Sequence, residues 1–134
     1  LLGELSGQQQ VEPRLQTGTV IGHVHLHVAD LDQADAFYRG VLGLELMQRY
    51  GDQALFFSAG GYHHHVGVNT WAGKGAPPPP PNAAGLRWFE LHLPDADALE
   101  AVLERLRTAG SPLEAHARGY LTRDPSQNGV VLSA

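Results

Sequence analysis

Cysteine is absent from this chain of 134 residues. Its absence excludes disulfides, thiolate metal ligands and cysteine nucleophiles, so histidine, aspartate, glutamate and tyrosine remain for any chemistry. Basic residues are also few, with 9 lysines and arginines against 14 aspartates and glutamates and a formal net charge of -5. Because these basic residues do not cluster, the sequence offers no phosphate-binding footprint, and we expect no nucleic acid among its partners.

Long apolar runs are missing too. No stretch approaches the roughly eighteen apolar residues that span a bilayer, and the first residues lack the basic region and apolar core of a signal peptide. We therefore expect a soluble, cytoplasmic protein with no membrane partner. The single methionine is Met47, so the chain does not begin at a start codon. It is expected to be one part of a longer polypeptide, a processed form, or a chain whose first residues are missing.

Histidine, in contrast, is abundant. Within residues 20–31, three histidines alternate with Val24, Leu26 and Val28, which predicts a strand with His23, His25 and His27 on one face. Histidine is the commonest metal ligand and titrates near neutral pH, so this row indicates a metal or proton-transfer site. The alternative is the exposed polar face of a half-buried strand.

The pattern predicts the order strand, helix, strand, strand, strand twice. In the first half the helix begins at Asp30 or Asp32 and ends near Gly40 or Gly43, and in the second it begins at Pro94-Asp95 and ends at Gly110. The other expected strands cover residues 44–50, 54–57, 62–71, 86–93, 113–116, 120–123 and 130–132.

Five successive prolines, Pro77 to Pro81, lie between the two halves. Residues 72–85 are therefore expected to be a connector of polyproline II character, although such a tract can also dock onto aromatic-lined modules. Residues 1–16 are interpreted as a lead-in or linker, and residues 17–134 as one domain with module one at 19–71 and module two at 86–134. The repeat predicts an α+β fold of two tandem βαβββ modules that form a half-open barrel with a central cleft.

Three segments resemble the vicinal oxygen chelate superfamily, which includes glyoxalase I, bleomycin-resistance proteins and extradiol dioxygenases. They are His23-Val24-x-Leu26-x-Val28-x-Asp30-Leu31, Phe37-Tyr38-Arg39-x-Val41-Leu42-Gly43-Leu44 and Asp124-Pro125-x-x-Asn128-Gly129. Residues 60–71, followed by Gly75-Ala76 and the proline tract, are similar to the catechol-2,3-dioxygenase-like proteins of the CatE type. Those proteins carry two such domains in tandem, and this chain resembles the second, C-terminal one.

The resemblance implies a divalent metal, Fe(II) or Mn(II) with Zn(II) as a further option, and a small aromatic diol as substrate. His23 matches the family's first metal ligand, but Trp88 and Val131 stand at two other ligand positions and cannot coordinate a cation. Substitutes would be His63 or His65 from the fourth strand and Glu90 from the fifth. Strand alternation would place His63 and His65 on one face and His64 on the other.

The same resemblance implies that His25 or His92 moves protons and that Tyr120, between His116 and Asp124-Pro125, belongs to a dioxygenase pattern with compressed spacing. The alternatives are that Tyr120 is a half-buried strand residue and His116 an exposed loop residue.

At the level of function, the alternatives to a ring-cleaving domain are a metal-free domain that packs on the other half of a longer enzyme and a drug-sequestering protein. The drug-sequestering alternative would use Trp88 and Phe89 in an aromatic cleft. A homodimer or a tandem partner domain is expected at the sheet edges.

Overall fold

The computed structural model describes residues 12–134, so the first 11 residues of the expected lead-in lie outside the described range. Both predicted modules form. Module one contains β1 (Val24–His27), α1 (Leu31–Asp35), its π-helical continuation η1 (Ala36–Val41), β2 (Glu45–Tyr50), β3 (Ala54–Ser58) and β4 (Val66–Asn69). Module two contains β5 (Phe89–His92), α2 (Ala96–Ala109), β6 (Glu114–His116), β7 (Gly119–Arg123) and β8 (Gly129–Ser133).

The helix boundaries follow the expected capping residues. The Asp30 carboxylate accepts a hydrogen bond from the backbone N–H of Gln33, and the Asp95 carboxylate accepts one from Ala98, so each aspartate satisfies a free N–H at a helix start. Gly110 ends α2 in the left-handed conformation at φ 69°. Gly40 does not end the first helix, because η1 continues through it to Val41, and the left-handed turn falls at Gly43.

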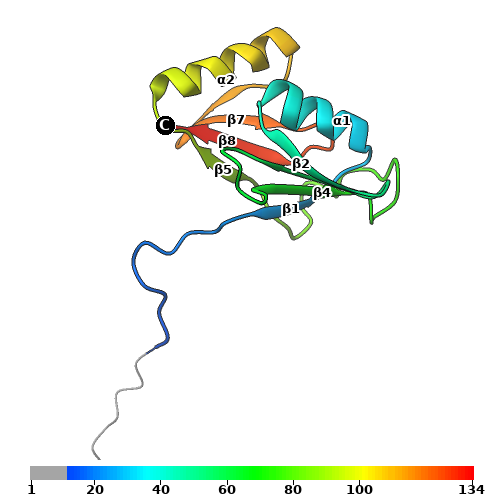
Figure 1. Cartoon of the computed structure of the whole chain (residues 1–134), viewed down its shortest axis with the longest axis horizontal. Coiled ribbons are helices and arrows are strands. Elements are labelled where there is room, and N and C mark those ends of the chain that lie inside the picture. The colour runs from blue at the N-terminus through cyan, green and yellow to red at the C-terminus, as the bar shows by residue number, and fades with distance from the viewer. Residues whose placement is uncertain (1–11) are drawn as a thin grey trace, which may run out of the picture.

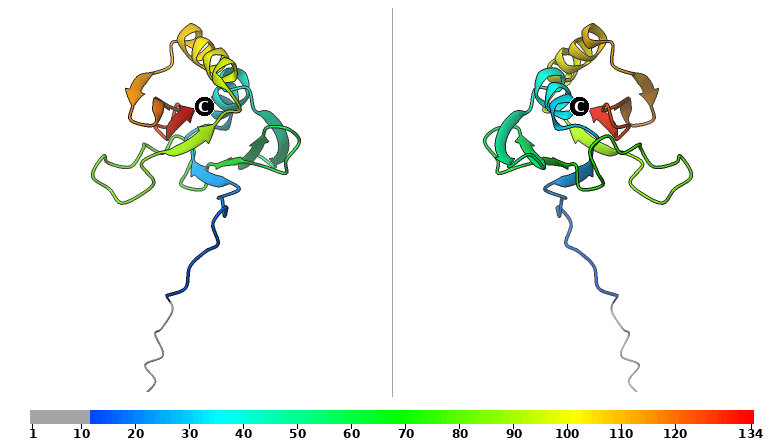
Figure 2. Two further views of the ribbon diagram at one scale, coloured as in Figure 1. Left: turned by 90° about the vertical axis from the view of Figure 1, so that its left-hand side faces the viewer. Right: turned by 90° about the vertical axis from the view of Figure 1, so that its right-hand side faces the viewer.

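Each module is a four-stranded open sheet with the same topology, in the orders β1-β4-β3-β2 and β5-β8-β7-β6. The first strand pairs in parallel with the last in both, Val24 opposite Val66 and Phe89 opposite Val130. Figure 2 shows the outer strands of the two sheets on opposite sides of the molecule with both helices between them. The two sheets therefore remain open and do not close into a barrel, and their equal registers confirm the internal repeat.

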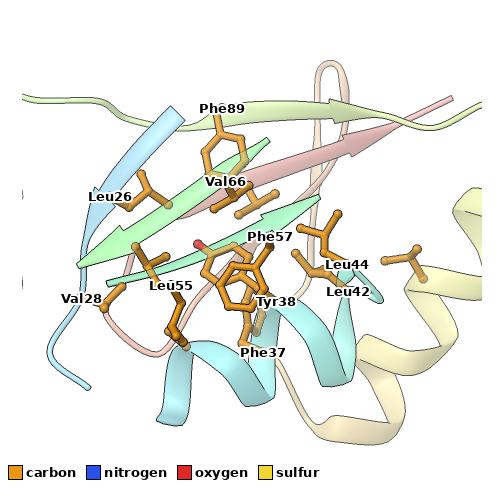
Figure 3. Packing of buried hydrophobic residues seen from close by; sticks show 14 of the residues in the cluster. Leu26, Val28, Phe37, Tyr38, Leu42, Leu44, Leu55, Phe57, Val66 and Phe89 are labelled. Atoms are coloured by element: carbon orange, nitrogen blue, oxygen red, sulfur yellow. The ribbon is translucent and has the colours of Figure 1, made fainter. Parts of the chain in front are cut away.

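A common core joins the two modules. Figure 3 shows Phe89 of β5 pointing toward the same apolar layer as Leu26 of β1 and Val66 of β4, with Tyr38 and Phe57 beneath. The Tyr38 and Phe57 ring centroids lie 5.7 Å apart. Figure 1 shows α1 and α2 on the same side of strands β1, β4 and β5. Because the apolar alternate residues of β1 and β5 point into this core, their polar alternates are on the opposite face.

A buried hydrogen-bond network also ties the modules together. The Asp124 carboxylate, which is 1% exposed, accepts a hydrogen bond from the Tyr38 hydroxyl at 2.8 Å. It accepts others from the backbone N–H groups of Ser126 and Asn128 and from the Asn128 side-chain amide. Asn128 donates as well to the carbonyl oxygen of His27. The turn before β8 is thereby fixed against the end of β1.

The helices that the structure describes include none long and apolar enough to cross a membrane.

Candidate functional site

Three imidazoles meet where β1 begins and where the loop before β4 ends. One ring nitrogen from each of His23, His63 and His64 lies within 4.8 Å of the others. The His23 and His64 ring centroids are 4.4 Å apart, and the His63 and His64 centroids are 4.8 Å apart. We call these three residues the histidine cluster. Burial and then the neighbouring histidines, His23 first among them, lower the pKa of His64, which favours its neutral, metal-binding form.

The position of His64 corrects the sequence prediction. Residues 62–65 were expected to be part of a strand in which His64 points away from His63 and His65, but β4 begins only at Val66. Gly60 and Gly61 both have positive φ, 67° and 76°, and turn the chain in a loop before that strand. The expectation of alternation is therefore wrong, and His64 is the cluster residue that the sequence interpretation missed. The paired glycines were the available signal, because they mark a loop in which alternation does not apply.

His65 stands beside the cluster but its ring is engaged. Its Nδ1 accepts a hydrogen bond from the backbone N–H of Ala59, and its ring stacks on Tyr62 at a centroid distance of 4.6 Å. Tyr62 lies between two histidines, because its ring is also 4.1 Å from that of His63. His65 therefore helps to hold the loop in place, and its assignment as a metal ligand stays a prediction.

A row of rings extends from the cluster across the polar face of the first sheet. The Phe56 ring lies 5.0 Å from His64 and 5.6 Å from His25, and His25 lies 5.4 Å from Trp71. Gly67 stands between Phe56 and His25 in the strand register, and a Cβ there would be 3.2 Å from both rings. Burial, and then the charges of His23 and His27, lower the pKa of His25. The result is an aromatic floor that ends at the histidine cluster.

The equivalent face of module two carries a different network. Glu90 accepts hydrogen bonds from the Ser133 hydroxyl and from Arg118 Nε, each at 2.5 Å, and His92 Nδ1 lies 2.9 Å from the same hydroxyl. The Ser133 hydrogen bond and then the Arg118 hydrogen bond lower the pKa of Glu90. Both Glu90 oxygens have partners within module two, and no hydrogen bond or ion pair among residues 12–134 joins Glu90 to the histidine cluster. The roles expected for Glu90 and His92 stay predictions.

The remaining predicted residues lie in module two as well. Trp88 packs on His116 with centroids 5.0 Å apart, and Tyr120 is 37% exposed on β7. Val131 is fully buried. Phe89 is part of the core and 9% exposed, so it cannot line an aromatic cleft together with Trp88, and this corrects the basis of the drug-sequestering alternative.

Two hollows lie near these faces. A groove of about 430 Å³ follows β1, where His25 and His27 face the connector residues 76–79 and Leu86. A pocket of about 210 Å³ lies between the modules and is lined by His65, His92 and apolar residues of both. His25 and Glu90, which were expected to share one site, do not line the same hollow in either case.

Comparison with known proteins defines the class. A family model described as the Glyoxalase/Bleomycin resistance protein/Dioxygenase superfamily matches residues 20–132. The chain belongs to this superfamily. It is 48% identical over 118 residues to a catechol-2,3-dioxygenase from Bacillus subtilis (strain 168), an alignment that covers 87% of this chain and 41% of that protein. The chain therefore spans less than half the length of this relative.

Solved structures agree on the architecture. A lactoylglutathione lyase from Agrobacterium tumefaciens is 26% identical, has a TM-score of 0.63, and is matched over 87% of this chain and 94% of that chain. A glyoxalase family protein from Enterococcus faecalis is 20% identical, has a TM-score of 0.65, and is matched over 89% of this chain and all (100%) of that one. The second likeness is one of fold alone.

Proposed function

We propose that this chain is one domain of a ring-cleaving dioxygenase of the extradiol, catechol-2,3-dioxygenase type, which uses a divalent metal and acts on a small aromatic diol. The observation that carries the proposal is the gathering of imidazoles around His23 at the edge of an aromatic floor. The 48% identity to a catechol-2,3-dioxygenase supports the same reaction class.

The donor set fits a divalent metal of the imidazole-binding kind, since His23 stands beside further ring nitrogens. Fe(II) and Mn(II) suit dioxygen chemistry, and Zn(II) accepts the same ligands. When bound, the metal supplies a positive charge that favours the ionised diol and open positions for ligand oxygens. Phe56 and Trp71 offer ring faces against which a planar aromatic substrate can stack. His25 lies between them and offers a ring nitrogen that accepts a proton from a diol hydroxyl.

Oxygen uptake tests this function directly. The tag-free chain is loaded anaerobically with Fe(II) or Mn(II) and mixed with catechol and dioxygen, and we expect oxygen consumption together with the absorbance of a ring-opened product. His23→Gln should abolish both signals. His27→Gln is the matched control, because His27 lies on β1 outside the histidine cluster, and it should keep the wild-type rate. A metal-loaded wild-type chain that consumes no oxygen contradicts the proposal.

A second candidate function is a non-catalytic domain that packs on the other half of a longer enzyme. Two observations favour it: Val131 is buried in the core at a ligand position of the family, and Glu90 is fully engaged by Arg118 and Ser133. The tandem partner is supported by the length of the Bacillus subtilis relative, of which this chain matches 41%. The alternative to a tandem partner is a homodimer of this chain. A folded chain that is inactive with metal but associates with the other half in size-exclusion chromatography would favour this function.

A further inference from the structure

We propose that His23, His63 and His64 form an all-imidazole binding site for one divalent transition-metal ion, with neither Glu90 nor His65 as a ligand. The ligand set differs from the substitutes that sequence reasoning suggested. The proposal concerns cation binding by the chain itself, so it can hold whether or not the domain cleaves aromatic rings.

The first support is the availability of the ring nitrogens. All three residues place a nitrogen within 4.8 Å of the others, and His23 and His63 are exposed while His64 is half-buried. No described residue makes a hydrogen bond to any of the three rings, whereas His65, His92 and His116 each have a hydrogen-bond partner at Nδ1. The three rings of the cluster therefore have lone pairs free for a cation, and what distinguishes them from His25 and His27 is that their nitrogens lie close together.

The second support is the way in which the loop is held. Tyr62 stacks between His63 and His65, and its hydroxyl lies 3.0 Å from the place where a Cβ on Gly22 would be. His65 is anchored in turn through Nδ1 to Ala59. Residues next to both His23 and His63 are therefore packed together, which keeps the loop close to the start of β1. Preorganisation of this kind lowers the entropy cost of gathering ligands around an ion.

The donor chemistry selects the class of cation. Imidazole nitrogen suits Zn(II), Cu(II), Ni(II), Co(II) and Fe(II), whereas Mg(II) and Ca(II) require oxygen ligands. A tetrahedral site with Zn–N distances near 2.05 Å needs nitrogens about 3.3 Å apart, so no pair of nitrogens has to approach by more than roughly 1.5 Å. Three protein ligands leave a fourth position for water or another ligand.

The test uses the full, tag-free chain and the metals alone. Zn(II) is titrated in by calorimetry, and Co(II) is followed by its visible absorption bands, which report the ligand number and geometry. We expect one Zn(II) per chain and no displacement by a large excess of Mg(II) or Ca(II). His23→Gln, His63→Gln and His64→Gln should each weaken binding at least about tenfold, since even loss of an outer-shell partner has that effect.

His27→Gln is the control. His27 lies on the same face of β1 but outside the cluster, so this variant should keep the wild-type affinity within about threefold. Circular dichroism of each variant verifies that it is folded. The proposal is overturned if the chain binds no Zn(II), if the His27 variant weakens binding as much as the cluster variants, or if His64→Gln has no effect. Zn(II) binding without any ring cleavage would reject the proposed function and leave this site standing. Ring cleavage that survives loss of His63 and His64 would reject this site and leave the proposed function standing.

Discussion

Replacing Tyr38 by phenylalanine should destabilise the chain more than any other loss of a single tyrosine hydroxyl. The Tyr38 side chain is fully buried, and its hydroxyl donates to the Asp124 carboxylate, which is 1% exposed. Tyr38→Phe keeps the ring that packs on Phe57 and removes one donor from a buried carboxylate. Hydrogen bonds to charged groups contribute about 1.5–3 kcal/mol, so the free energy of unfolding should fall by about that amount.

Urea unfolding followed by the fluorescence of Trp71 and Trp88 measures this change. Tyr50→Phe is the matched control, because Tyr50 is 63% exposed, and its effect should stay within about 0.5 kcal/mol. A double-mutant cycle with Asp124→Asn should give a coupling energy of at least about 0.5 kcal/mol, because the two side chains are in contact. Equal losses in Tyr38→Phe and Tyr50→Phe would show that the buried hydrogen bond adds nothing and would refute the reasoning.

The same bridge predicts a loss of stability at alkaline pH. Burial, then the charge of Asp124 and the hydrogen bond to it, raise the pKa of Tyr38 well above its ordinary value. A group whose pKa is higher in the folded state contributes stability that is fully present below its unfolded pKa, about 10 for tyrosine, and is lost as pH rises toward the folded value. The fall in wild-type stability above about pH 10 should therefore be smaller in Tyr38→Phe.

Two further predictions concern the polar faces of the sheets. Gly67→Ala places a Cβ 3.2 Å from the rings of His25 and Phe56, so these rings must move apart by a few tenths of an ångström. The His25 imidazole signals in NMR spectra should therefore shift, and unchanged signals would contradict the close approach. Arg118→Ala should raise the pKa of Glu90, measured by NMR titration of its carboxyl carbon, because hydrogen bonds from Ser133 and then from Arg118 lower that pKa in the wild type; Ser133→Ala should raise it further. A carboxyl group whose pKa is lowered by folding stabilises the folded chain at pH values above its unfolded pKa. This contribution to wild-type stability is lost as the pH falls through the folded pKa. A Glu90 titration that is the same in Arg118→Ala and the wild type would show that the ion pair does not form in solution.

Much of the fold could be predicted because local signals agreed with one another. Asp30, Asp95 and Gly110 bound the helices as expected, and the alternation of apolar residues located the central strands. The fourth strand was predicted too long, since residues 62–65 directly precede the apolar residues of β4 and were interpreted as its first residues. Their conformation depends instead on the turn at Gly60 and Gly61 and on the contacts that the Tyr62 and His65 rings make. A periodic sequence pattern does not reveal such contacts.

The site was less accessible to sequence reasoning for a related reason. His23 could be identified from its position directly before β1, but its neighbours come from a loop, and loop residues are oriented by side-chain contacts and not by periodicity. The engagement of Glu90 was also hidden, because both of its partners are distant in sequence. Ser133 reaches Glu90 through the pairing of β5 with β8, and Arg118 reaches it from the turn between β6 and β7.

The duplicated architecture explains why one module carries a histidine cluster and the other does not. The parallel registers place Val24 opposite Val66 in module one and Phe89 opposite Val130 in module two. His23 and His64 therefore correspond to Trp88 and Asn128. In module two the Asn128 side chain binds Asp124 and the carbonyl oxygen of His27, so this position holds the turn against β1. In module one the equivalent position is free of such contacts and carries an imidazole that points toward its neighbours. The same backbone position thus holds the interface through Asn128 in module two and carries an imidazole of the histidine cluster in module one.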